Sequence, residues 1–267
     1  MRPRRETDFF DLPLPRIIAH RGASGDYPEN TMPAFRAAVE LGVRYLELDV
    51  HLSRDGEVVV CHDDTLTRVA AHDGVFREMT VAEIRRADAG YNFSPVSTGA
   101  FPFRGLGIRV PILHEVLTSF PHQRFIIELK QATHDLAAAT LDVVQRARMT
   151  RSVLIASEHQ EPIDHARAIA PDVPTNMPAQ EVGLFMMSLS PHAEPYAPAG
   201  DALQVPPEYH SWKLVTPESV GAAHRAGAEV HVWTVDEASE MRALLALGVD
   251  GILTNHPSRM LRVVSGR

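Results

Sequence analysis

The chain has 267 residues, of which 45% are hydrophobic and 22% are charged, and a formal net charge of −8 when histidine is neutral. This composition is typical of a soluble globular enzyme and excludes a disordered or collagen-like chain. The negative charge argues against nonspecific binding to nucleic acid or anionic lipid, so an anionic substrate would need a local positive site.

Short β-rich segments recur along the chain and alternate with amphipathic helical patterns. In chain order, the predicted strands are residues 16–20, 45–50, 124–130, 153–157, 174–177, 202–205, 229–235 and 251–255. The helices predicted between them include residues 31–41, 136–149, 162–170, 217–226 and 236–247. This alternation favours an α/β fold, a closed (β/α)8 TIM barrel whose chemistry sits at the C-terminal ends of the strands. An open doubly wound sheet is the alternative.

One segment, residues 57 to about 111, interrupts the alternation after the second strand. It begins with the strand-like sequence VVVCHD and continues through a stretch rich in Gly, Pro and Asp, with a short helical piece near residues 80–87. The Asp-Gly pair at 55–56 predicts a tight turn, which would fold the second strand back onto VVVCHD as a hairpin. We therefore expect a single domain over residues 1–267 that carries a small inserted subdomain.

Carboxylates occur at strand positions that are normally apolar. Glu47 and Asp49 are two residues apart in YLELDV and therefore point to one face, as do Glu128 and Lys130 in IIELK. Buried carboxylates are costly unless they are paired or bind a cation. Three acidic oxygen donors suit one hard divalent cation, Ca²⁺ or Mg²⁺, rather than zinc. A buried salt-bridge network with Lys130 and Arg21 is the alternative.

Two histidines stand where predicted strands end. His20 closes the first strand, and His62 closes the hairpin strand. Two imidazoles near a metal could act as general base and general acid close to neutral pH. Arg21 and Lys130 could hold phosphate oxygens. Taken singly, each histidine has a structural or surface role as its alternative.

Five sequence motifs follow one another nearly from end to end of the chain. They are AHRGASGDYPENTMPAF at 19–35, ELDVHLSRDGEVVVCHDDTLTR at 47–68, IIELK at 126–130, HVWTVD at 231–236 and GVDGILTNHP at 248–257. In this order the motifs resemble the glycerophosphodiester phosphodiesterase family. The resemblance implies a TIM barrel with a small insertion, and it also implies roles for eight residues. These are a divalent cation on Glu47, Asp49 and Glu128, acid–base roles for His20 and His62, phosphate contacts from Arg21 and Lys130, and a pocket-lining position for Trp233. Asn255 departs from the Asp that family members often carry.

The resemblance also implies a reaction. It indicates metal-dependent hydrolysis of glycerophosphodiesters, such as glycerophosphocholine or glycerophosphoethanolamine, to an alcohol and sn-glycerol 3-phosphate. A lysophospholipase D-like enzyme acting on lipids and a noncatalytic phosphate-binding barrel are the alternatives. For the lipid hypothesis, Phe93, Phe101, Phe103 and Leu106 of the insertion could meet an acyl chain, or they could simply pack the insertion onto the barrel.

The sequence also indicates a compartment and a class of partner. Cys61 is the only cysteine, so an intrachain disulfide is excluded. The N-terminus lacks the apolar run of a signal peptide, and the chain has no stretch of roughly 18 apolar residues, the minimum for spanning a membrane. We therefore expect a cytoplasmic protein that acts on a small phosphodiester, without nucleic acid and without stable membrane insertion. The sequence predicts no particular oligomeric state.

Overall fold

The computed structural model describes residues 7–95 and 99–266, and its centre is a sheet of eight strands. The strands are β1 (Arg16–Ala19), β2 (Tyr45–Leu52), β3 (Val58–Val60), β4 (Arg124–Leu129), β5 (Val153–Ala156), β6 (Ala202–Val205), β9 (Glu229–Val232) and β10 (Gly251–Thr254). Seven of them pair in parallel in the order β5-β4-β2-β1-β10-β9-β6. The remaining strand, β3, pairs with β2 in the antiparallel direction.

The two edge strands, β5 and β6, are joined by the segment 174–177, which its sequence predicts to be a strand. In the structure this segment forms only two isolated parallel bridges, Ile155 with Thr175 and Asn176 with Ala202. Pro174 begins this segment and Pro178 follows it, and both prolines lack the N–H group that a longer ladder needs. Neighbours in the chain are thus neighbours in the sheet, and β1 pairs with β10, which makes the fold TIM-barrel-like. The prediction of a (β/α)8 barrel is confirmed. An open doubly wound sheet, whose strand order reverses, is excluded.

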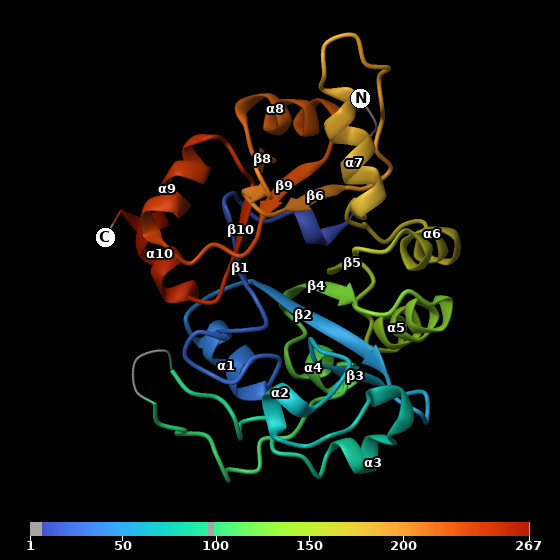
Figure 1. The fold of residues 1–267 in the computed structure, drawn as a ribbon, viewed down its shortest axis with the longest axis vertical. Helices are drawn as coiled ribbons and strands as arrows, with labels where there is room; N and C mark the ends of the chain where they lie inside the picture. Colours follow the sequence, from blue (N-terminus) through green and yellow to red (C-terminus); the bar gives the residue numbers. More distant parts are fainter. Residues whose placement is uncertain (1–6, 96–98, 267) are drawn as a thin grey trace.

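Helices surround the strands (Figure 1). They are α1 (Met32–Glu40), α4 (Leu113–Ser119), α5 (His134–Arg146), α6 (Gln160–Ile169), α7 (Ala179–Ser188), α8 (Pro217–Ala226), α9 (Ala238–Ala246) and α10 (Pro257–Ser265). Five of these, α1, α5, α6, α8 and α9, lie where the sequence predicts helices, whereas α4, α7 and α10 are not predicted. Helix α7 has the sequence AQEVGLFMMS, which is apolar around most of its circumference and so lacks the amphipathic stripe used to recognise helices.

The insertion begins with the predicted hairpin. Strand β3 pairs with β2 through Val50–Val60 and Leu52–Val58, and Gly56 takes the left-handed backbone conformation of the turn, with φ of +83°. After β3 come α2 (Thr67–Ala70), a 3₁₀ turn η2 (Phe76–Glu78) and α3 (Val81–Ile84), which together form the lower end of the molecule in Figure 1. The insertion has a buried apolar cluster of its own, which includes Phe76 and Ile84.

The N-terminal segment closes the base of the barrel. The 3₁₀ turn η1 (Asp8–Phe10) places Phe9 in an apolar cluster with inward-facing strand residues such as Ile18 and Ile126. Beside this cluster, the Arg16 guanidinium donates two hydrogen bonds to the Glu229 carboxylate, at 2.6 and 2.7 Å. Both side chains are 1% exposed. The base therefore contains a fully buried, mutually neutralised ion pair.

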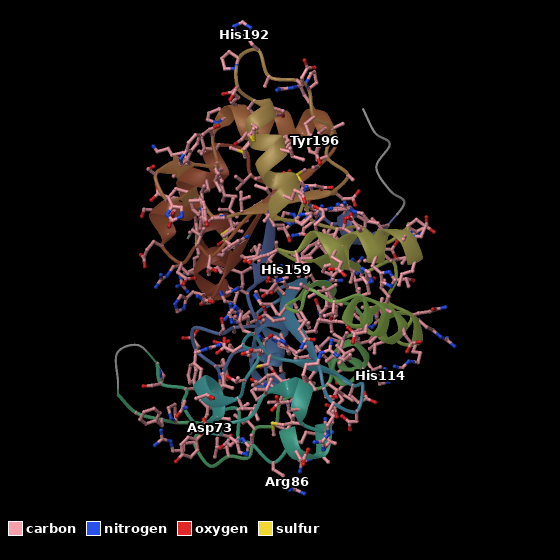
Figure 2. The ribbon with its side chains drawn as sticks, turned by 45° about the vertical axis from the view of Figure 1, so that its right-hand side comes forward. Asp73, Arg86, His114, His159, His192 and Tyr196 are labelled. Carbon is pink, nitrogen blue, oxygen red and sulfur yellow. The ribbon has the colours of Figure 1, made fainter. Side chains whose placement is uncertain are left out.

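A second, two-stranded antiparallel sheet follows β6. It consists of β7 (Glu208–Tyr209) and β8 (Trp212–Lys213). The loop after α7, marked by His192 and Tyr196 in Figure 2, forms one end of the molecule, and the insertion, marked by Asp73 and Arg86, forms the other. Within residues 7–95 and 99–266, none of the helices combines the length and apolar character needed to cross a membrane.

Candidate active site

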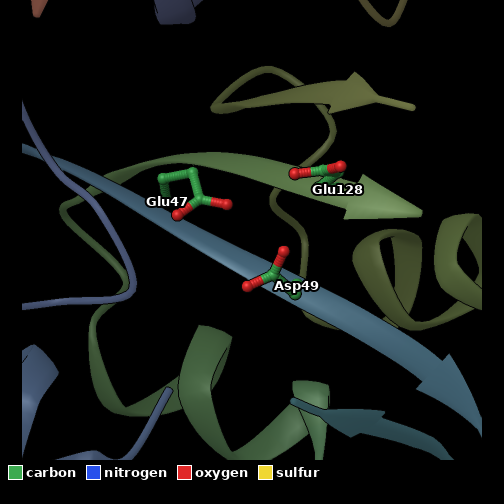
Figure 3. A group of neighbouring side chains, drawn as sticks. All are labelled: Glu47, Asp49 and Glu128. Atoms are coloured by element: carbon green, nitrogen blue, oxygen red, sulfur yellow. The ribbon is translucent and has the colours of Figure 1, made fainter. Parts of the chain in front are cut away.

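Three carboxylates meet where β2 and β4 lie side by side. Glu47 and Asp49 share one face of β2, and Asp49 is the direct register partner of Glu128 on β4. Figure 3 shows the three side chains over these two strands. Each offers an oxygen atom within 4.8 Å of the others. Glu47 and Asp49 are 2% and 0% exposed, whereas Glu128 is partly accessible.

The electrostatics of this cluster are those of crowded anions. Burial, followed by the charges of Asp49 and Glu128, raises the pKa of Glu47 well above its usual range. Burial and the charge of Asp49 raise the pKa of Glu128 to about 7. The buried Oδ1 atom of Asp49 has no hydrogen-bond partner. Oxygen-only donors, excess negative charge and an unsatisfied buried oxygen together fit a hard divalent cation.

Two cationic side chains lie against the carboxylates. Arg21 Nε is 3.1 Å from Asp49 Oδ2, and the backbone N–H of Arg21 donates to Glu47 Oε2 at 2.9 Å. Lys130 Nζ lies 3.0 Å from Glu128 and 3.7 Å from Asp49. These contacts confirm part of the salt-bridge alternative. They do not replace the cation hypothesis, because Asp49 Oδ1 receives no hydrogen bond and is faced only by Lys130 Nζ, at 3.7 Å.

The segment between His20 and α1 positions Arg21 and Asp49. Glu29 accepts a hydrogen bond from Arg21 Nη1 at 3.0 Å. The Asn30 side-chain amide donates to Asp49 Oδ2 at 2.8 Å. Thr31 caps α1, because its side chain accepts a hydrogen bond from the N–H of Ala34. The PENT motif thus combines a helix cap with two contacts that orient the charged cluster.

His20 is held by a chain of polar contacts from the end of β10. The Asn255 amide nitrogen donates to Asp236 at 2.8 Å, so the Asn255 oxygen faces His20 Nδ1, also at 2.8 Å. The ring must therefore donate through Nδ1, which leaves the Nε2 lone pair free, 4.0 Å from Glu47. Burial, followed by the positive charge of Arg21, lowers the pKa of His20 and favours this neutral form.

His62 has a different environment, provided by the insertion. Its Nδ1 lies 2.7 Å from the carboxylate of Asp63, which Arg68 also contacts at 2.6 Å. Although burial raises the pKa of Asp63, hydrogen bonds from Arg68 and His62 lower it more, to about 2. The ionised Asp63 carboxylate accepts the hydrogen bond of His62 Nδ1 and so orients the ring. Arg68 reaches across to Glu29 at 2.7 Å and ties the insertion to the barrel mouth.

One cavity joins these groups. Its volume is about 1100 Å³, and it is lined by His20, His62, Arg21, Lys130, Glu47, Glu128 and Trp233 among others. Asp49 does not line the cavity but contacts Arg21 and Lys130, which do. The structure therefore brings together the eight residues to which the sequence analysis gave catalytic, metal or substrate roles. The apolar residues of the insertion, Phe93, Phe101, Phe103 and Leu106, do not line this cavity. The sequence analysis missed the orienting roles of Asp63, Arg68 and Asp236. Only the sequence HDD, one residue after the end of β3, could have indicated the first of them.

Comparisons with known proteins point to one family of phosphodiesterases. Residues 20–259 match the model of the glycerophosphoryl diester phosphodiesterase family. A glycerophosphodiester phosphodiesterase from Caldanaerobacter subterraneus subsp. tengcongensis is 30% identical over 93% of this chain and 97% of its own length. The crystal structure of a glycerophosphodiester phosphodiesterase from Agrobacterium tumefaciens is 27% identical, with a TM-score of 0.73 over 92% of this chain and 98% of that one. An Oleispira antarctica phosphodiesterase, solved in complex with the product sn-glycerol-3-phosphate, shares the fold at 24% identity, with a TM-score of 0.76 over 94% of this chain and 97% of that one.

Proposed function

Because the chain belongs to the glycerophosphoryl diester phosphodiesterase family and is a phosphodiesterase of that class, we propose that it hydrolyses glycerophosphodiesters such as glycerophosphocholine or glycerophosphoethanolamine. The products would be the free alcohol and sn-glycerol 3-phosphate. One observation carries the proposal: a buried, unsatisfied acidic cluster shares a cavity with two histidines and two cationic side chains. The glycerol phosphate bound by the Oleispira relative supports the identity of the product.

Glu47, Asp49 and Glu128 would hold one Ca²⁺ or Mg²⁺ ion. When bound, such an ion supplies positive charge that neutralises phosphate oxygens and makes phosphorus more open to attack. The ion would also satisfy Asp49 Oδ1 and offset the repulsion that raises the pKa values of Glu47 and Glu128. The donor set consists of oxygen atoms alone, which favours these two ions over zinc.

Arg21 and Lys130 would hold the nonbridging oxygens of the phosphodiester. Both line the cavity, and both are anchored by carboxylates rather than extended into solvent. Arg21 presents a planar guanidinium that can donate two parallel hydrogen bonds, whereas Lys130 presents a compact charge. Because both cations are preorganised, they can stabilise the charge that develops in the transition state without a large rearrangement.

The two histidines would divide the proton transfers. His20, neutral and with Nε2 free, would accept the proton of the attacking hydroxyl, which comes from water or from the neighbouring hydroxyl of the glycerol. His62, supported by the ionised Asp63, would donate a proton to the departing alkoxide. The P–O bond to the alcohol breaks as the new P–O bond forms. Attack by the glycerol hydroxyl would give a cyclic phosphate that water opens afterwards.

Phosphorus NMR of glycerophosphocholine tests the reaction directly. With the protein and Mg²⁺ or Ca²⁺, the diester signal should be replaced by that of glycerol phosphate, and a transient cyclic phosphate signal would identify the glycerol hydroxyl as nucleophile. Exhaustive chelation should stop the conversion. Unreacted diester in the presence of both ions would refute the proposed substrate, and full activity after chelation would refute the metal role.

A change of leaving group tests the division of labour between the histidines. A glycerophosphodiester of p-nitrophenol has a leaving group that needs no proton. His62→Ala should therefore lose about 100-fold in turnover on glycerophosphocholine but less than about tenfold on the p-nitrophenyl ester. His20→Ala should lose about 100-fold on both substrates. The reverse pattern would exchange the two roles.

A further inference from the structure

His51 continues, on β2, the row of side chains that contains Glu47 and Asp49. Side chains two residues apart on a strand share a face, so all three point to the same side of β2. At His51 the neighbouring strand is β3, where its register partner is Val59. Val59 belongs to the apolar cluster of the insertion, and His51 is 2% exposed. The same face of β2 therefore carries two carboxylates in the barrel and a buried histidine against the insertion.

One ring nitrogen of His51 has a defined partner. His51 Nε2 lies 3.0 Å from the backbone carbonyl oxygen of His62. Because a carbonyl oxygen only accepts hydrogen bonds, Nε2 must carry a proton and donate it to this bond. The His51 ring also stacks on Phe76 of the insertion, with ring centroids 5.6 Å apart and 25° between the ring planes. The stacking holds the plane of the ring, so the Nε2–H group is aimed at one carbonyl.

The other ring nitrogen of His51 is not used. Within the described part of the chain, the buried Nδ1 atom has no hydrogen-bond partner. A buried polar atom without a hydrogen bond opposes folding, and a leucine beside Val59 and Phe76 would avoid that cost. The imidazole is therefore poorly suited to packing alone. The hydrogen bond from Nε2 to His62 is the contribution that an apolar side chain could not make.

The carbonyl that His51 holds belongs to the peptide between His62 and Asp63. This peptide lies beyond Val60, the last residue of β3, in a bend outside the sheet. The His62 ring and the Asp63 carboxylate branch from the two ends of this peptide, and they meet at 2.7 Å through Nδ1. A fixed carbonyl direction therefore fixes the imidazole and the carboxylate that orients it relative to each other.

Strand β2 thus holds the backbone on both sides of His62. Before His62, the N–H of Cys61 donates to the backbone oxygen of Asp49 at 3.0 Å. After it, the carbonyl accepts from His51. The first contact joins two backbone groups, whereas the second depends on the side chain at position 51. Position 51 is therefore the place where a substitution can alter the setting of His62 and leave the hairpin pairing unchanged.

We propose that His51 is a positioning residue for the proton donor: its Nε2–H group holds the peptide between His62 and Asp63 and so keeps the His62 ring directed at the departing alkoxide. This inference rests on the proposed function, because it requires His62 to be the donor. His51 lies outside the cavity that His62 lines, so it acts through His62 and does not touch substrate. A displacement of about 1 Å can cost a catalytic group about 100-fold in rate, so one hydrogen bond behind the ring can have a measurable effect on turnover.

The choice of leaving group distinguishes this role from a structural one. His51→Leu removes the N–H donor and suits the apolar surroundings. Its turnover of glycerophosphocholine should fall by about tenfold, whereas its turnover of the p-nitrophenyl ester, whose leaving group needs no proton, should fall by less than about twofold. His51→Gln keeps an N–H donor and should recover most of the turnover of glycerophosphocholine. Wild-type turnover of glycerophosphocholine by His51→Leu, or an equal loss on both substrates, would overturn the inference.

A double-mutant cycle shows whether His51 acts through His62. If it does, adding His51→Leu to His62→Ala should lower turnover of glycerophosphocholine by less than about a further twofold, because the ring that His51 positions is already absent. Two independent roles would multiply the losses to about 1000-fold. Losses that multiply in this way would overturn the inference.

Ile84→Val is the matched control for packing. Ile84 lies in the same buried cluster as Phe76, and its shortening should lower the melting temperature without removing the donor on His51. The ratio of the two turnovers should therefore stay at the wild-type value. A fall of the ratio as large as that of His51→Leu would assign the effect to loosening of the insertion and overturn the inference. If His51→Leu does not fold, His51→Met removes the same donor with a more adaptable side chain.

The outcomes separate this inference from the proposed function. If His62→Ala depends on the leaving group and His51→Leu does not, the positioning role is overturned and the proposed function stands. If His62→Ala loses equally on both substrates, the donor role of His62 and the positioning role of His51 are overturned together, while the reaction itself stands. Absence of turnover by the wild type with either substrate would overturn both proposals.

Discussion

The two ends of the barrel bury charge in opposite ways. At the base, Arg16 and Glu229 neutralise each other through two short hydrogen bonds. Although burial raises the pKa of Glu229, hydrogen bonds from Arg16 and His231 lower it more, to about 2. At the mouth, Glu47 is equally buried, but burial, followed by the charges of Asp49 and Glu128, raises its pKa. A buried glutamate therefore stabilises the fold at the base and destabilises it at the mouth.

This difference shows how a functional carboxylate can be told from a structural one. A carboxylate kept for stability has a lowered pKa and a complete set of partners. A carboxylate that binds a ligand has a raised pKa, and an oxygen atom in its cluster lacks a hydrogen-bond partner. The ligand supplies that partner when it binds. Asp49 Oδ1 at the mouth is such an oxygen.

The largest effect is expected at the base. Glu229→Gln leaves Arg16 buried without a counter-charge and should lower the free energy of unfolding by about 3–5 kcal/mol, measured by urea titration at pH 7. Because the folded-state pKa of Glu229 is lowered to about 2, its stabilising contribution exists above its usual value of 4.5 and is lost as the pH falls through about 2. The difference between wild type and variant should therefore shrink over that interval. A constant difference would contradict the ion-pair interpretation.

The next effect is expected at the mouth, and on activity instead of stability. His20→Ala and His62→Ala should each lower turnover of glycerophosphocholine by about 100-fold. Both rings are partly solvent-exposed and border the cavity, so the melting temperature should change little. Activity assays run in parallel with thermal melts would check this. Wild-type turnover in either variant would remove that histidine from the mechanism.

Metal addition should stabilise the mouth specifically. At a concentration about 100 times its dissociation constant, a divalent ion should raise the free energy of unfolding of the wild type by about 2.7 kcal/mol. Asp49→Asn removes one ligand charge and should abolish most of that gain, whereas Glu229→Gln, altered at the opposite end, should retain it. Equal stabilisation of both variants by Ca²⁺ or Mg²⁺ would place the ion elsewhere.

The smallest effect on stability is expected for Glu47→Gln, and it tests most directly whether the base and the mouth differ. Glu47→Gln keeps an acceptor for the backbone N–H of Arg21 and removes one of the repelling charges. In metal-free protein at pH 7 its free energy of unfolding should lie within about 1 kcal/mol of the wild type, or above it, because a raised folded-state pKa means that ionisation of Glu47 opposes folding. A loss comparable to that of Glu229→Gln would show that the mouth is built for stability after all.

Much of the fold follows from local patterns. The strands can be predicted because their apolar runs end at polar residues. Glu47 and Asp49 can be predicted to lie together because side chains two residues apart share one face of β2. Helix α7 could not be predicted in this way, because an amphipathic pattern needs a polar side and α7 has none of sufficient width.

Contacts between distant residues could not be predicted from those patterns. Asn255 fixes the orientation of His20 from 235 residues away, and Glu229 neutralises Arg16 from 213 residues away. In both cases the partners meet only because the barrel closes through β1 and β10. Local periodicity carries no information about that closure, whereas the ordered motifs, through family resemblance, indicated the site as a whole.

The attachment of His62 has an evolutionary consequence. His20 ends a strand of the barrel, but His62 follows β3, the hairpin strand that opens the insertion. The backbone N–H of Cys61 is bonded to Asp49, so the position of His62 is set by the barrel even though the chain beyond it is not part of the barrel. A change in the length or sequence of the insertion beyond His62 would therefore alter what approaches the mouth and leave the proposed proton donor in place.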